Sequence, residues 1–116
     1  MKYKYIGTEE QLIEHGFVDG DMSYSHGAYH TNYGFTRVAK DFKTKTLFVA
    51  IITRISVYNI EQETTKNYKS NRIVIIQANK RRNYGGYMWG SYHETQDDIT
   101  PYIQDLIDAN LVEVIA

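Results

Sequence analysis

The sequence contains no cysteine and only one proline among its 116 residues. Without cysteine the protein cannot form disulfides, thiolate zinc sites or a cysteine nucleophile. No apolar run approaches the roughly 18 residues of a membrane-spanning helix, and the first residues, Met1-Lys2-Tyr3-Lys4-Tyr5, lack the apolar segment of a secretion signal. These absences predict a soluble protein of the cytoplasm that does not contact membranes.

The common enzyme motifs are also missing. The chain has no GxGxxG, no GxxxxGK[ST] and no GxSxG pattern, and Gly85-Gly86 alone does not make a phosphate-binding loop. Neighbouring polar residues such as Asp97 and Asp98 point apart on a strand or helix, so adjacency does not assemble a catalytic pair. The sequence therefore predicts a protein that is not an enzyme and uses no cofactor.

What the sequence does contain is an ordinary globular composition with a strong excess of tyrosine. Hydrophobic residues make up 42% and charged residues 23% of the chain, which is typical of soluble domains. The length predicts one domain, residues 1–116. Tyrosine accounts for 11 residues, beside 4 phenylalanines and 1 tryptophan. Tyrosine favours strands and places a hydroxyl group next to water or a partner.

Charge is sorted along the chain. Residues 64–93 carry only basic charges, whereas residues 94–116 carry only acidic ones. The basic stretch includes residues 80–93, in which cations, aromatic rings and glycines occur together. Arginine binds phosphates or carboxylates in a bidentate manner, and tyrosine and tryptophan are frequent at protein interfaces and stack on bases. The predicted partner-binding residues are Arg81, Arg82, Tyr84, Tyr87 and Trp89, with Lys66, Lys69 and Arg72 providing electrostatic steering.

Several alternatives to this binding site remain open. The segment 80–93 can be part of an ordinary hairpin with core aromatics. Alternatively, the basic and aromatic hairpin 72–93 can bind nucleic acid or a nucleotide instead of a host protein or nucleoprotein complex. The acidic residues can be the binding face by imitating phosphates; they are Glu94, Asp97, Asp98, Asp105, Asp108 and Glu113. A dimer formed through edge strands is a further possibility.

A metal site is the third alternative. His26 and His30 are four residues apart, and on a helix they would face the same way and could hold a metal with Asp19, Asp21 or His93. The glycines and tyrosines around them disfavour a helix. The sequence therefore predicts no metal.

The periodicity predicts an α+β fold with a mainly antiparallel sheet of about five to six strands and two short helices. A capping box at Thr8 and Gln11 begins the first helix, which ends at Gly16. The second helix is expected within residues 97–110, with Thr100 as its cap and Asn110 at its end. The expected strands are residues 2–6, 35–42, 46–53, 72–77, 87–93 and 111–115, with 55–60 extending the third or standing alone. Residues 18–34 are expected to form a loop with one short strand at most, and residues 61–70 a polar connection.

The C-terminal residues 105–114 and the turn at residues 41–46 give the chain a resemblance to small accessory proteins of phages and prophages of Gram-positive bacteria. This resemblance implies a compact, non-enzymatic protein that acts on host machinery, such as an inhibitor of a bacterial defence system of the anti-CRISPR type. If the protein is phage-encoded, it acts in the cytoplasm of the host cell. The resemblance supplies no catalytic residues.

Overall fold

A computed structural model describes residues 1–79, 93–95 and 97–115. Within these residues the chain forms eight strands and three short helices. The strands are β1 (Tyr3–Tyr5), β2 (Val18–His26), β3 (Tyr29–Asp41), β4 (Lys45–Asn59), β5 (Thr64–Lys69), β6 (Arg72–Asn79), β7 (His93–Glu94) and β8 (Val112–Val114). The helices are α1 (Glu9–Glu14), the 3-10 helix η1 (Thr100–Tyr102) and α2 (Gln104–Asp108).

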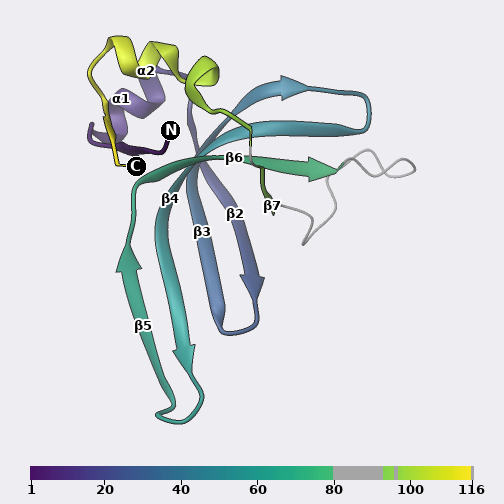
Figure 1. The fold of residues 1–116 in the computed structure, drawn as a ribbon, viewed down its shortest axis with the longest axis vertical. Helices are drawn as coiled ribbons and strands as arrows, with labels where there is room; N and C mark the ends of the chain where they lie inside the picture. The colour runs from purple at the N-terminus through teal and green to yellow at the C-terminus, as the bar shows by residue number, and fades with distance from the viewer. Residues whose placement is uncertain (80–92, 96, 116) are drawn as a thin grey trace.

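All eight strands belong to one curled antiparallel sheet with the order β2-β3-β4-β6-β1-β8. β5 pairs with β4, and β7 pairs with β6. The predicted α+β class and the antiparallel pairing are confirmed, but the sheet has more strands than the five to six expected. Figure 1 shows α1 and α2 together over one end of the sheet, while β2, β3, β4 and β5 run away from them.

The long strand β4 takes part in two different regions of the sheet. Its first half, residues 45–51, pairs with β6, and its second half, residues 54–59, pairs with β5. β3 runs beside β4 along nearly its whole length. We call residues 22–33 and 54–69 the arm, because there the sheet consists of β2, β3, β4 and β5 and projects from the helical end (Figure 1).

The sheet is buried on both of its faces near the middle of β4 and β6. Alternate residues of β4 enter opposite clusters, Leu47, Val49 and Ile51 on the helical side and Phe48, Ala50 and Ile52 on the other. This arrangement explains why these two strands are continuously apolar in the sequence. The helical cluster is completed by side chains from the helices and the terminal strands, among them Leu12, Phe17, Ile103, Leu106 and Leu111.

The first helix forms as its sequence predicts. The Thr8 hydroxyl accepts from the backbone N–H of Gln11 at 3.2 Å, and the Gln11 side chain accepts from the backbone N–H of Thr8 at 2.9 Å. Gly16 follows the helix with φ of 84°, and the N–H of Phe17 returns to the carbonyl of Leu12. This ending matches the predicted left-handed cap, and it directs the ring of Phe17 into the core.

Three sequence predictions about secondary structure were wrong. Residues 18–34 are not a loop but the β2–β3 hairpin, since Gly20 and Gly34 lie at irregularities of the strand register and Gly27, with φ of 57°, lies in the turn. Residues 64–69 form β5 although every one of them is exposed. The C-terminal helix is shorter than predicted, because the 3-10 turn at Pro101 precedes α2. For residues 55–60 the sequence left two alternatives, an extension of the preceding strand or a separate strand. The structure shows the extension, since β4 continues to Asn59.

Arg37 of β3 joins the sheet to both helices. Its guanidinium group donates to the two carboxylate oxygens of Asp105, each at 2.7 Å, and to the carbonyl oxygens of His15 at 2.7 Å and Tyr102 at 2.9 Å. It also lies over the ring of Phe17 at 4.7 Å. A bidentate pair of this kind fixes both groups in position, so Arg37 orients α1 and α2 on the sheet.

The Arg37–Asp105 pair predicts a loss of stability in acid. The guanidinium of Arg37, and to a smaller extent the ring of His15, hold the pKa of Asp105 well below its usual range despite partial burial. Because this pKa is lower in the folded than in the unfolded chain, where it is about 3.9, the pair stabilises the fold fully above about pH 5 and less as the pH falls through the folded pKa. We expect urea denaturation between about pH 5 and pH 2 to show a smaller decline in the free energy of unfolding for Asp105→Asn than for the parent. Equal declines would contradict this assignment.

Candidate functional site

The arm presents two chemically different faces, which follow from the strand register. Two rows of polar residues cross all four strands on one face. The row nearer the tip is Ser25, His30, Ser56 and Asn67, and the row nearer the helical end is Ser23, Asn32, Arg54 and Lys69. We call these eight residues the polar face. It contains two permanent cations and no carboxylate.

Hydrogen bonds connect the polar face across three strands. His30 Nδ1 lies 2.5 Å from the hydroxyl of Ser25. The amide of Asn32 donates to His30 Nε2 at 2.9 Å, and its oxygen accepts from Arg54 Nε at 3.1 Å and Nη2 at 2.8 Å. On the other side of β4, Ser56 donates to Asn67 at 2.7 Å. Asn32 therefore holds the guanidinium of the exposed Arg54 in a fixed orientation.

The hydrogen bonds of His30 argue against a nucleophilic role for Ser25. Because Nε2 accepts from Asn32, the proton of the neutral imidazole is on Nδ1 and points at the Ser25 oxygen. An imidazole in this tautomer cannot take the hydroxyl proton, which is the step that activates a serine nucleophile. The Ser25–His30 pair is therefore suited to hydrogen bonding and orientation.

Arg54 and Lys69 are the unusual feature of this surface. They are direct partners in the β4–β5 register, so their β-carbons lie about 5 Å apart. Like charges in this position repel each other. Neither side chain forms an ion pair within the described parts of the chain. Two adjacent cations that no described residue neutralises provide a binding place for an anion.

The opposite face of the arm is apolar and aromatic. Its residues include Tyr24, Tyr29, Ile55, Val57, Lys66 and Tyr68. Tyr24 and Ile55 pack against the second core cluster, whereas Tyr29 and Tyr68 are 58% and 52% exposed. We call these six residues the tyrosine face. The two faces differ because successive residues of a strand point to opposite sides of the sheet.

A cleft of about 420 Å³ lies beside the first half of β6, between the N-terminus and residues 94–99. Its charged lining residues are Lys2, Arg72, Glu94, Asp97 and Asp98. Arg72 donates to Glu94 at 2.9 Å, and the carboxylate of Asp98 accepts from the N–H and hydroxyl of Thr100, which lower its pKa. The charges in this cleft therefore largely compensate one another, in contrast to Arg54 and Lys69.

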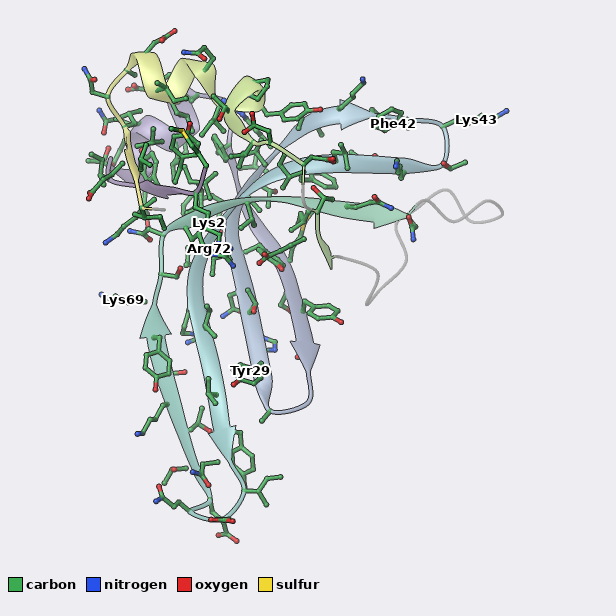
Figure 2. All side chains as sticks on the ribbon, viewed as in Figure 1. Lys2, Tyr29, Phe42, Lys43, Lys69 and Arg72 are labelled. Atoms are coloured by element: carbon green, nitrogen blue, oxygen red, sulfur yellow. The ribbon has the colours of Figure 1, made fainter. Side chains whose placement is uncertain are left out.

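The predicted steering residues do not gather on one surface. Lys69 belongs to the polar face and Lys66, three residues earlier on the same strand, to the tyrosine face. Arg72 is on β6 and is paired with Glu94. Figure 2 shows Lys69 and Arg72 near the base of the arm. The other predicted binding residues lie outside the described residues, as does most of the strand expected at 87–93; they are Arg81, Arg82, Tyr84, Tyr87 and Trp89.

The acidic residues of the C-terminal region do not form one separate anionic face. Glu94 and Asp105 are paired with arginines, and Asp98 caps η1. Asp108 accepts from the Gln104 amide at 2.9 Å, and Glu113 is opposite Lys4 in the β1–β8 register. Only Asp97 among these residues has no such contact within the described parts of the chain. This distribution gives phosphate imitation no structural support.

The two histidines of the alternative metal site do not have the helical arrangement that this site requires. His26 and His30 lie on the two antiparallel strands of the β2–β3 hairpin and not on one helix. The described residues bring together no group of three His, Asp or Glu side chains that could hold a metal ion. Within the same residues, no helix is both long and apolar enough to cross a membrane.

The sequence predictions missed His30, Asn32 and Arg54 as members of one site. A signal was available in the segments Ser23-Tyr24-Ser25 and Arg54-Ile55-Ser56-Val57, where polar and apolar residues alternate as in a two-faced strand. Comparison of the chain with protein-family models, with curated proteins and with solved structures finds no match in any of the three. The functional argument therefore rests on the geometry of the arm.

Proposed function

We propose that this protein is a non-catalytic binding protein that docks an anionic surface of a macromolecular partner on the polar face of its arm. The observation that supports this function best is the pairing of Arg54 with Lys69, two adjacent cations without a described carboxylate partner. The resemblance of residues 105–114 to phage accessory proteins implies the same mode of action, in which the protein occupies a surface of host machinery and can thereby inhibit a defence system.

The fixed orientation of Arg54 supports recognition as well as attraction. Asn32 accepts from Nε and Nη2, so the donors of Nη1 remain available to a ligand. An arginine whose rotamers are already restricted loses less entropy when it binds. Lys69, the hydroxyl groups of Ser23 and Ser25, and the amide of Asn67 add further hydrogen-bonding groups on the same face.

Retention on an immobilised polyanion tests this function. On a sulfated polysaccharide resin eluted with a salt gradient, the double variant Arg54→Ala/Lys69→Ala is expected to elute earlier than the parent, with an affinity about tenfold lower at fixed salt, because two charged contacts are lost. Both side chains are exposed, so thermal unfolding should be nearly unchanged.

The charge-matched control is Lys40→Ala/Lys43→Ala. Both lysines are exposed, Lys40 near the end of β3 and Lys43 in the turn that follows, which lies away from the arm in Figure 2. Their removal changes the net charge by the same amount. If the two double variants elute at the same salt concentration, retention reflects net charge alone and the proposed function is wrong.

A further inference from the structure

We propose that the anionic partner of the polar face is single-stranded nucleic acid, an inference that rests on the proposed function and specifies its ligand. The side chains of this face are serine, asparagine, histidine, arginine and lysine. Arginine, lysine, serine and asparagine are among the side chains that commonly contact phosphates and sugars in nucleic-acid complexes. The two rows are about 7 Å apart along the strands and extend about 14 Å across them.

An aromatic ring completes the surface at its outer side. Tyr58 follows Arg54 and Ser56 at alternate positions of β4, is paired with Thr65, and is 44% exposed. Its backbone N–H donates to the carbonyl of Ala28 at 2.9 Å, which fixes this part of the strand. A base can stack on the ring of Tyr58 while phosphates contact Arg54 and Lys69.

The number of charges favours a single strand over a duplex. Duplex binding draws on contacts with many phosphates, whereas the polar face offers two permanent cations. Glu61 and Glu63 follow in the β4–β5 turn, where their charge opposes extension of a polyanion past Tyr58. The site therefore fits a short segment whose bases are free to stack.

The polarity of the face favours nucleic acid over an acidic protein. Protein interfaces are energetically centred on large apolar or aromatic anchors that become fully buried. None of the eight residues of the polar face is apolar, and Tyr58 lies at one end of it. Interfaces with nucleic acid are more polar and more positively charged, as this surface is.

Fluorescence anisotropy with labelled 10-nucleotide probes tests the inference. We expect the full-length protein to bind single-stranded oligo(dT) or oligo(U) more tightly than a hairpin duplex. Two phosphate contacts on a single strand give a slope of about −1.4 in a plot of log affinity against log salt concentration. Arg54→Ala/Lys69→Ala should weaken binding about tenfold and flatten this slope.

The variant Tyr58→Leu separates stacking from charge. It should weaken binding about fivefold or more without changing the salt slope. Tyr29→Leu is the matched aromatic control, because Tyr29 is also exposed, at 58% against 44% for Tyr58, but belongs to the tyrosine face, and it should bind like the parent. Equal effects of the two tyrosine substitutions would overturn the stacking role.

The outcomes distinguish the inference from the proposed function. If Arg54→Ala/Lys69→Ala lowers retention on the polyanion resin but poly-glutamate displaces the single-stranded probe as well as unlabelled oligonucleotide does, the partner is not nucleic acid and the proposed function stands. If the duplex binds as tightly as the single strand, the inference of a single-stranded ligand is wrong and the proposed function stands. If the double variant behaves like Lys40→Ala/Lys43→Ala in both assays, both proposals are wrong.

Discussion

Replacing Arg37 by methionine is expected to lower the free energy of unfolding by about 2 to 3 kcal/mol. The side chain is only 16% exposed and donates to four acceptors on three elements. Methionine keeps the apolar contact with Phe17 but leaves the carbonyls of His15 and Tyr102 without this donor. Thermal unfolding followed by circular dichroism should show a decrease in Tm of about 10 °C.

Arg37→Lys distinguishes the geometry of the guanidinium from its charge. Lysine retains the positive charge but cannot bridge both carboxylate oxygens of Asp105 in a bidentate manner. We expect this variant to recover less than half of the lost stability. A lysine variant as stable as the parent would mean that a simple charge attraction, and not the four-bond arrangement, holds the helices.

Gly34→Ala is expected to destabilise the protein by about 2 to 3 kcal/mol, because it adds a methyl group where there is no room. A β-carbon at Gly34 would lie closer than 3.0 Å to both γ atoms of Thr53 and 3.1 Å from its Cβ. Threonine is branched at Cβ and cannot rotate both γ atoms away. Urea denaturation of the variant should give a lower midpoint with an unchanged slope.

The second-site substitution Thr53→Ala should restore most of the stability of Gly34→Ala. It removes both γ atoms and leaves only the 3.1 Å contact, which a small shift of the backbone relieves. Thr53→Ala alone should cost little, since its hydroxyl forms only a long bond of 3.4 Å to the carbonyl of Asn32. Additive losses in the double variant would show that steric conflict is not the cause.

The sequence predicted the parts of the fold that carry strong local signals. The capping box at Thr8, the glycine cap at Gly16 and the apolar strands around Val49 and Ile75 all form where they were expected. β5 was missed because none of its residues is buried. Its pairing with β4 comes from backbone hydrogen bonds, which leave no hydrophobic period in the sequence.

The polar face could be predicted only in part, because its members come from four strands. Alternation in residues 23–25 and 54–57 indicates that each strand has a polar side, but not which polar sides coincide. That depends on register, and a shift of one residue would place each side chain on the other face. The approach of Arg54 to Asn32 and Lys69 therefore follows from the pairing and not from spacing in the chain.

The bulge at Thr53 has a consequence for changes in chain length. Asn32 pairs with Arg54 and Tyr33 with Ile52, so Thr53 is an extra residue on β4. Deleting Thr53 would leave Arg54 and Ser56 on the polar face and Ile55 on the tyrosine face, because Ile52 and Ile55 already lie on the same side of the sheet and would then be two positions apart, as in a regular strand. Deleting one residue further along the arm, such as Ile55, would exchange the sides of every β4 residue that follows it. Insertions of two residues in each strand beyond the bulge would instead lengthen the arm and keep its surfaces. Homologous chains should therefore differ in arm length by even numbers of residues per strand.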